Sequence, residues 1–310
     1  MFDFYFTGVP HNSSVADFLL ESEGACLLLS QLNERSNIYK WIDRIKKTQS
    51  HLKLFIDSGA FSAWTKGKKI DIDEYITFIN TYKEYLTICA SVDTIPGKPR
   101  GSTLASEQEV KEASQKTWEN FLYMRSKMDN VDKLLYTFHA GEPWEYLVQA
   151  LDYVDDKGPI NYIALGGLVG KNKDVIINFL DKAFEYIMKS KNPNLKVHAF
   201  GMTRLDILEE YPFTSADSTS WLQTANFGNI TIGSKNICLS DRKLLSDDNI
   251  INKNTALYED VVKIIEDKGF TLEELQTNSE SRLKFNVLNY WDWSKNYQCT
   301  YNPISKIDLF

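Results

Sequence analysis

Eight short apolar runs, each followed by a longer polar segment, constrain the fold of this chain more than any other feature of its sequence. The runs span residues 2–7, 25–30, 52–56, 86–92, 133–138, 162–165, 195–200 and 213–216. Several of the segments between them repeat apolar residues at helical spacing, as in 36–47, 72–85, 106–128, 143–154, 175–189 and 205–211. Because parallel strands need crossover connections, this alternation predicts an α/β fold. A (β/α)8 TIM-type barrel is the first choice, and a doubly wound open sheet is the alternative.

The chain beyond residue 217 departs from this alternation. Residues 229–232 form one more strand-like run, and 256–268 and 272–288 have helical spacing. Thr271 and Glu274 predict a capping box before the second of these helices. We therefore expect two parts: a barrel with the catalytic site over residues 1–235, and a C-terminal helical extension over 236–310 that packs on the barrel.

Composition narrows the functional classes. The chain has 310 residues and a formal net charge of -7. This charge argues against tight non-specific binding to nucleic acid, although a local basic patch remains compatible with it. The four cysteines form no CxxC pair, which indicates reduced thiols in a cytosolic protein. The sequence has neither a signal-peptide pattern nor an apolar run that could span a bilayer, so we expect a cytoplasmic protein without a membrane partner.

Polar residues and glycines stand where the apolar runs end. Both candidate folds bind ligands at the carboxyl ends of their strands. Asp57, Asp93 and Asp217 each follow an apolar run directly, so we expect their carboxylates to share one pocket. The ends of other runs carry His139, Gly166, Gly167 and Gly201.

The adjacent glycines at 166 and 167 have two interpretations. They could leave bare backbone against which a flat ligand lies, or they could form a tight turn that needs positive φ. His198 lies inside a run and is typical of a core histidine.

Three carboxylates at one rim are compatible with several kinds of chemistry. A carboxylate can attack an electrophilic carbon, transfer a proton, or accept the two adjacent N–H donors of a guanine edge. Asp57, Asp93, His139 and Asp217 are also residue types that metallohydrolase barrels use. The metal interpretation is weaker because no HxH pair follows the first run and the chain has only four histidines.

Three segments resemble the tRNA-guanine transglycosylases, also called queuine tRNA-ribosyltransferases. Asp57-Ser-Gly-Ala-Phe61 is similar to that family's Asp-Ser-Gly-Gly-Phe segment. Ala164-Leu-Gly-Gly-Leu-Val-Gly170 is similar to its Gly-Gly-Leu-Ala-Val-Gly loop. Phe213-Thr-Ser-Ala-Asp217-Ser falls where the family has its nucleophile strand. The resemblance covers a little over half of the chain and implies a (β/α)8 barrel that exchanges a guanine base in nucleic acid for a 7-deazaguanine.

The resemblance also implies a role for each matching residue. Asp217 would be the nucleophile that attacks C1′ of the sugar, and Asp57 would be the general acid and base. Asp93 would grip the Watson–Crick edge of the base. The remaining substrate-binding residues would be Gly166 and Gly167 through their backbone, Phe61 (or Trp64) by stacking, His139 in place of a family glutamine, and Gly201.

Departures from the family pattern modify these expectations. The CxCxxC zinc segment is absent, so we expect neither structural zinc nor another cofactor. The arginine-rich segment after the nucleophile is absent too. These losses favour, by a small margin, DNA over tRNA as the partner and resemble the enzymes of phages and prophages. A homodimer or a partner subunit is compatible with the sequence. Two alternatives stay open: a non-catalytic nucleic-acid-binding subunit of a transglycosylase, and an unrelated metal-dependent barrel hydrolase.

Basic residues follow the same strand ends and could receive a phosphate backbone. The alternative is that they are ordinary solubilising surface residues. They are Lys66, Lys68, Lys69, Lys98, Arg100, Lys171, Lys173 and Arg204.

Overall fold

The computed structural model describes residues 2–98, 105–239 and 258–301, and within them eight parallel strands close into a barrel. The strands are β1 (Asp3–Thr7), β2 (Cys26–Ser30), β3 (Lys53–Asp57), β4 (Leu86–Ala90), β5 (Leu134–His139), β8 (Tyr162–Gly166), β9 (Lys196–Ala199) and β10 (Ser215–Ser218). They follow one another around the barrel in chain order, and β10 pairs with β1 to complete it. The predicted (β/α)8 barrel is therefore confirmed and the open sheet is wrong.

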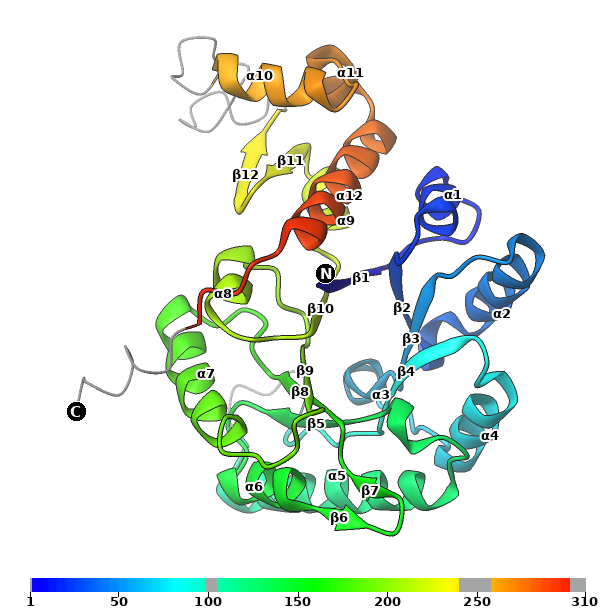
Figure 1. Cartoon of the computed structure of the whole chain (residues 1–310), viewed down its shortest axis with the longest axis vertical. Coiled ribbons are helices and arrows are strands. Elements are labelled where there is room, and N and C mark those ends of the chain that lie inside the picture. The colour runs from blue at the N-terminus through cyan, green and yellow to red at the C-terminus, as the bar shows by residue number, and fades with distance from the viewer. Residues whose placement is uncertain (1, 99–104, 240–257, 302–310) are drawn as a thin grey trace.

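Helices surround the strands (Figure 1). The ones that the sequence predicts are α2 (Gln31–Thr48), α4 (Ile72–Tyr82), α5 (Glu107–Lys127), α6 (Trp144–Asp152), α7 (Lys173–Ile187) and α8 (Leu205–Glu210). The structure adds α1 (Ser14–Glu21), α3 (Ala60–Lys66), α9 (Ser220–Asn226), the 3-10 turn at Val131–Lys133, and a hairpin of β6 (Val154–Asp155) and β7 (Gly158–Pro159). Along the described residues, no helix is long and apolar enough to cross a membrane.

The alternation of side chains along each strand decides which residues face the barrel interior. Phe55, Leu135 and Ala164 belong to the apolar cluster that fills this interior. Successive residues of a strand point to opposite faces, so residues two or four positions later point inward again. Asp57 and His139 are such residues, which places both in the layer above the apolar filling, at the carboxyl-end mouth.

In the C-terminal part, the residues that the structure describes form a hairpin and three helices. The hairpin pairs β11 (Asn229–Ile232) with β12 (Lys235–Cys238), and the helices are α10 (Tyr258–Asp267), α11 (Leu272–Thr277) and α12 (Ser279–Asn296). The single helix expected over 272–288 is wrong. Asn278 ends α11, and its side chain accepts hydrogen bonds from the N–H groups of Glu280 and Ser281, which starts a new helix. α12 then continues to Asn296.

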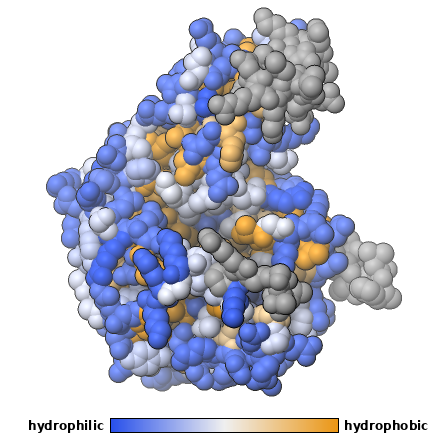
Figure 2. All heavy atoms as spheres, turned by 180° about the vertical axis from the view of Figure 1, so that it is seen from behind, coloured by the Kyte–Doolittle hydropathy of each residue, from blue (hydrophilic) through white to orange (hydrophobic). Residues whose placement is uncertain are grey.

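α12 occupies the place of an eighth barrel helix. It runs beside β1 in Figure 1 and packs on α9, β1 and α1. Its Tyr290 ring stacks on Phe4 of β1 with 4.7 Å between ring centroids. The backbone N–H of Phe2 donates to the Ser294 carbonyl at 3.1 Å. The first strand is thus covered by the last helix. Seen from behind, the molecule has a mainly polar surface, with apolar side chains reaching it mostly toward the middle of this face (Figure 2).

Candidate active site

Three aspartates meet at the carboxyl-end mouth of the barrel. Asp57 is the last residue of β3, Asp217 lies in β10, and Asp93 lies in the loop after β4. The side chains of Asp93 and Asp217 are only 12% and 13% exposed. Burial and the charges of Asp93 and Asp217 together raise the pKa of Asp57 to about 7, against the opposing hydrogen bond from the Gly59 N–H at 3.0 Å. The structure therefore brings the three predicted carboxylates together.

Asp217 is held from behind by a buried chain of hydrogen bonds. Its Oδ1 accepts from the Gly201 N–H at 2.8 Å and bonds His198 Nε2 at 3.2 Å. The other ring nitrogen of His198 bonds Ser215 Oγ at 2.7 Å, and Ser215 Oγ bonds the Tyr162 hydroxyl at 2.7 Å. Because Oδ1 takes both donors, Asp217 Oδ2 is left with no hydrogen bond to any described residue.

His198 is fully buried, as expected of a core histidine, but it also contacts the predicted nucleophile. That contact was missed by sequence reasoning. Pairing of β9 with β10 aligns His198 with Ser215, two positions before Asp217 on the same face. The alternation of side chains along both strands, which points His198, Ser215 and Asp217 to the same face, could have predicted the contact.

His139 lies between two carboxylates. Its Nε2 is 3.2 Å from Asp93 Oδ2, and its Nδ1 is 3.0 Å from Glu142 Oε1. Burial alone lowers the pKa of His139, but the hydrogen bonds and charges of Asp93 and Glu142 outweigh burial and raise the pKa to about 10. The ring is therefore an imidazolium at neutral pH. Glu142 was not among the predicted site residues, although its position three residues after His139 could have suggested it.

The two adjacent glycines serve the packing around His139. A Cβ on Gly166 would lie 2.8 Å from His139 Cδ2, closer than real Cβ contacts. Gly167 has φ +74°, so the tight-turn interpretation is correct for this residue. Gly201 has φ +62°, and a Cβ there would lie 2.6 Å from a methyl group of Val169. The missing side chain of Gly166 thus makes room for the imidazolium.

The aromatic pair after β3 stands at the rim. Phe61 lies on α3, is 67% exposed, and tilts against Trp64 with 5.9 Å between ring centroids. Trp64 Nε1 donates to the Gly97 carbonyl at 2.9 Å, which ties α3 to the loop after β4. Phe61 therefore offers an open ring face for stacking.

The predicted phosphate-binding residues that the structure describes lie on the loops after the strands or on the helices that follow. Lys66 ends α3, and Lys173 begins α7, where it is half-buried and pairs with Asp206 at 3.1 Å. Lys68, Lys98 and Lys171 are exposed. Lys66 donates to Asn33 Oδ1 at 2.9 Å, and Arg204 pairs with Asp206 at 3.0 Å. Arg100 lies outside the described residues.

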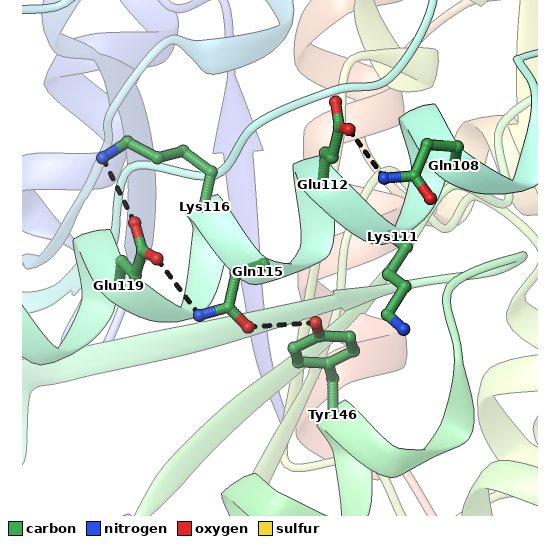
Figure 3. A pocket seen from close by; sticks show the side chains of 7 residues that line it. All are labelled: Gln108, Lys111, Glu112, Gln115, Lys116, Glu119 and Tyr146. Atoms are coloured by element: carbon green, nitrogen blue, oxygen red, sulfur yellow. Dashed lines mark hydrogen bonds and ion pairs between the residues drawn. The ribbon is translucent and has the colours of Figure 1, made fainter.

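A shallow pocket of about 290 Å³ lies elsewhere, on the outer surface of α5 beside Tyr146 of α6 (Figure 3). Its lining is Gln108, Lys111, Glu112, Gln115, Lys116, Glu119 and Tyr146. Several of these side chains bond one another, as Gln115 does with Tyr146 and Glu119. None of the residues at the barrel mouth lines it.

Within residues 2–98, 105–239 and 258–301, no three His, Cys, Asp or Glu side chains are arranged to hold a metal ion.

Comparisons with known proteins assign no family to the chain. No protein-family model matches the chain, and no curated protein matches it. Among solved structures, the chain is similar to the open form of tryptophan synthase from M. tuberculosis, with 7% identity and a TM-score of 0.38. The match covers 72% of this chain and 85% of that chain. Similarity at this level carries no information on function.

Proposed function

We propose that this protein is a base-exchange enzyme that replaces a guanine in nucleic acid by a 7-deazaguanine, with DNA slightly favoured over tRNA. The observation that carries the proposal is that Asp57 and Asp217 lie at the same barrel mouth in different environments. Asp57 has a pKa of about 7, so it can both give and take a proton near neutral pH. Asp217 has its Oδ1 bonded by Gly201 and His198, which leaves Oδ2 without a hydrogen bond to any described residue and available to attack a carbon.

The exchange takes two displacements at C1′ of the sugar. Asp217 Oδ2 attacks C1′, the C1′–N9 bond breaks with its electron pair going to guanine, and guanine takes a proton from Asp57. An incoming 7-deazaguanine then gives its N9 proton to Asp57. Its N9 attacks C1′, and the bond between C1′ and Asp217 breaks, which restores the free carboxylate. Since the base must reach a buried mouth, it has to leave its stack in the nucleic acid first.

The other residues of the mouth have supporting roles in this proposal. Asp93 accepts the N–H edge of the base, and Phe61 offers an exposed ring for stacking. Lys68 and Lys171, exposed on loops after β3 and β8, would meet the phosphate backbone.

The experiment is incorporation of labelled guanine, and of a labelled 7-deazaguanine, into duplex DNA, single-stranded DNA and tRNA. We expect label in at least one nucleic acid and a denaturation-resistant protein–nucleic acid adduct that depends on Asp217. Absence of both label and adduct with all three substrates would overturn the proposal. Base release without incorporation would favour a hydrolase instead, and binding without either reaction would favour a non-catalytic subunit.

A further inference from the structure

Both nitrogens of the His139 ring are already engaged within the protein. Nε2 lies 3.2 Å from Asp93 Oδ2 in an ion pair, and Nδ1 bonds Glu142 Oε1 at 3.0 Å. An imidazolium has two N–H donors and no acceptor, so a ring in this state has no free N–H group for a hydrogen bond to a base. This differs from the expectation that His139 contacts the base in place of a glutamine.

Glu142 itself is out of reach of a substrate. Its side chain is 4% exposed, and its only hydrogen bond among the described residues is the one to His139. Its second oxygen, Oε2, is buried without a hydrogen-bond partner in the same part of the chain. A carboxylate in such a place is costly to bury, and a buried oxygen without a partner calls for an explanation beyond packing.

The position of the His139 ring is fixed by the neighbouring strand. Gly166 of β8 passes so close that any Cβ would collide with the ring, at 2.8 Å from Cδ2 and 3.1 Å from Nε2. The backbone of Gly166 therefore borders the ring on one side, and the two carboxylates hold its nitrogens. The orientation of His139, and with it the direction of the Nε2–H bond, is determined by these three neighbours.

Asp93 is the more exposed of the two carboxylates beside His139, whose own ring is 23% exposed. Its Oδ2 forms the ion pair with His139, while its Oδ1 has no hydrogen bond to any described residue. Its side chain keeps 12% exposure at the mouth. A carboxylate held in this way can accept two adjacent N–H donors, which guanine-type bases present at N1 and the 2-amino group.

We propose that Glu142 is a positioning residue that acts through His139 to hold the Asp93 carboxylate against the N1–H and 2-amino edge of a guanine-type base. This inference rests on the proposed function and deepens it. In this proposal Asp93 selects the base, and His139 does not contact the base directly. Glu142 supports Asp93 through His139 and does not touch the substrate.

The charged groups around the ring define a pH dependence that tests the inference. Asp93 faces His139 from the loop after β4, Glu142 faces it from the turn before α6, and β8 presents only glycine there. Asp57 on β3 interacts electrostatically with Asp93. With Glu142 replaced by glutamine, the ring loses one of its two anionic partners and should release its proton at lower pH.

The test is equilibrium binding of guanine and of hypoxanthine, which lacks the 2-amino group, to the full-length protein between pH 6 and pH 9. We expect the wild type to prefer guanine by about tenfold or more, because a hydrogen bond to a carboxylate is lost with hypoxanthine. Glu142→Gln should weaken guanine binding about tenfold, and increasingly so as the pH rises. The matched control is Glu145→Gln, the same change at an exposed position three residues later, which should bind like the wild type.

A double variant separates a support role from a merely structural one. His139→Gln keeps one neutral N–H donor for Asp93, so it should retain part of the affinity and lose the pH dependence. If Glu142 acts only through His139, adding Glu142→Gln to His139→Gln costs nothing more. Additive losses, or Glu142→Gln binding like the wild type, would overturn the inference while wild-type guanine exchange still stands. Failure of the wild type to bind or exchange guanine would instead defeat the proposed function and this inference together.

Discussion

His198 and Asp217 are joined inside the barrel mouth by a contact of 3.2 Å between Nε2 and Oδ1, and the ring of His198 has no exposed surface. The ring also packs edge-on against Phe55 and Phe200, with centroids 5.0 Å and 4.7 Å apart. His198 thus extends a polar contact to the proposed nucleophile from a largely aromatic floor of the mouth.

Replacing Asp217 tests the nucleophile directly. Asp217→Asn should lower guanine exchange at least about 10³-fold and abolish the covalent adduct, because an amide oxygen does not attack C1′. Exchange assays and gel analysis of the denatured adduct measure both effects. The control is Asp174→Asn, an exposed aspartate at the start of α7, which should exchange normally. Undiminished exchange by Asp217→Asn would remove this residue from the mechanism.

Replacing His198 separates support of the nucleophile from packing. His198→Phe keeps an aromatic ring between Phe55 and Phe200 but removes both hydrogen bonds. We expect kcat to fall about 10- to 100-fold with little change in KM for the base, since the loss concerns the orientation of Asp217. The free energy of unfolding should fall by about 1–3 kcal/mol because Ser215 and Asp217 lose a buried partner. A change confined to KM would contradict this role.

The raised pKa of Asp57 predicts two pH effects. Exchange should show an inflection near pH 7, where Asp57 changes protonation. Because folding raises the pKa from 3.8 to about 7, the contribution of Asp57 to stability is present below pH 3.8 and is lost as the pH rises through 7. Asp57→Asn should therefore be inactive and yet more stable than the wild type above pH 7, by on the order of 2 kcal/mol.

Thermal denaturation at pH 4 and pH 8 measures the second effect. The gain of Asp57→Asn should appear at pH 8 and shrink at pH 4. Asp156→Asn, an exposed aspartate in the turn between β6 and β7, should show no such difference. Equal melting temperatures of wild type and Asp57→Asn at both pH values would show that the ionised form of Asp57 does not destabilise the fold.

The close approach of Gly166 to His139 predicts a coupled pair. Gly166→Ala should displace the imidazolium and destabilise the fold by about 1–3 kcal/mol, as overpacking in a close-packed interior does. In a His139→Ala background the ring is gone, so the same change should cost at least about 1 kcal/mol less. A double-mutant cycle by chemical denaturation measures this coupling. Additive effects would show that Gly166 has a role independent of His139.

Salt dependence tests the basic residues at the mouth. If Lys68 and Lys171 meet phosphates, each change to alanine should reduce the slope of log affinity against log salt by about 1. Arg204→Ala should have less effect, because Arg204 already pairs with Asp206. Lys40→Ala, on the outer helix α2, serves as the control. Slopes that do not differ between these variants would return the lysines to the role of solubilising surface.

Periodicity in the sequence was enough to predict the barrel and most of its helices. Apolar runs at strand length and apolar residues at helical spacing place these elements within a few residues of their observed bounds. The convergence of Asp57, Asp93 and Asp217 followed from one rule, that the carboxyl ends of parallel strands meet at one mouth.

Features that depend on neighbours in space were not predictable in the same way. α3 begins at Ala60, after the N-cap residue Gly59, which has φ +85° and no side chain to cap the helix, so no local sequence signal predicts it. His198 and Glu142 acquire their partners from strand register and from a turn. The break at Asn278 was overlooked because apolar residues keep helical spacing through it.

The packing of α12 on β1 has a consequence for how the molecule is assembled during synthesis. Phe2 and Phe4 are synthesised almost three hundred residues before the surface that covers them, around Tyr290 and Ser294. Until then β1 lacks the cover that α12 provides, and the contacts that supply this cover join residues almost three hundred positions apart. Contacts between residues so distant in the sequence slow folding, so β1 can complete its packing only after α12 has been synthesised.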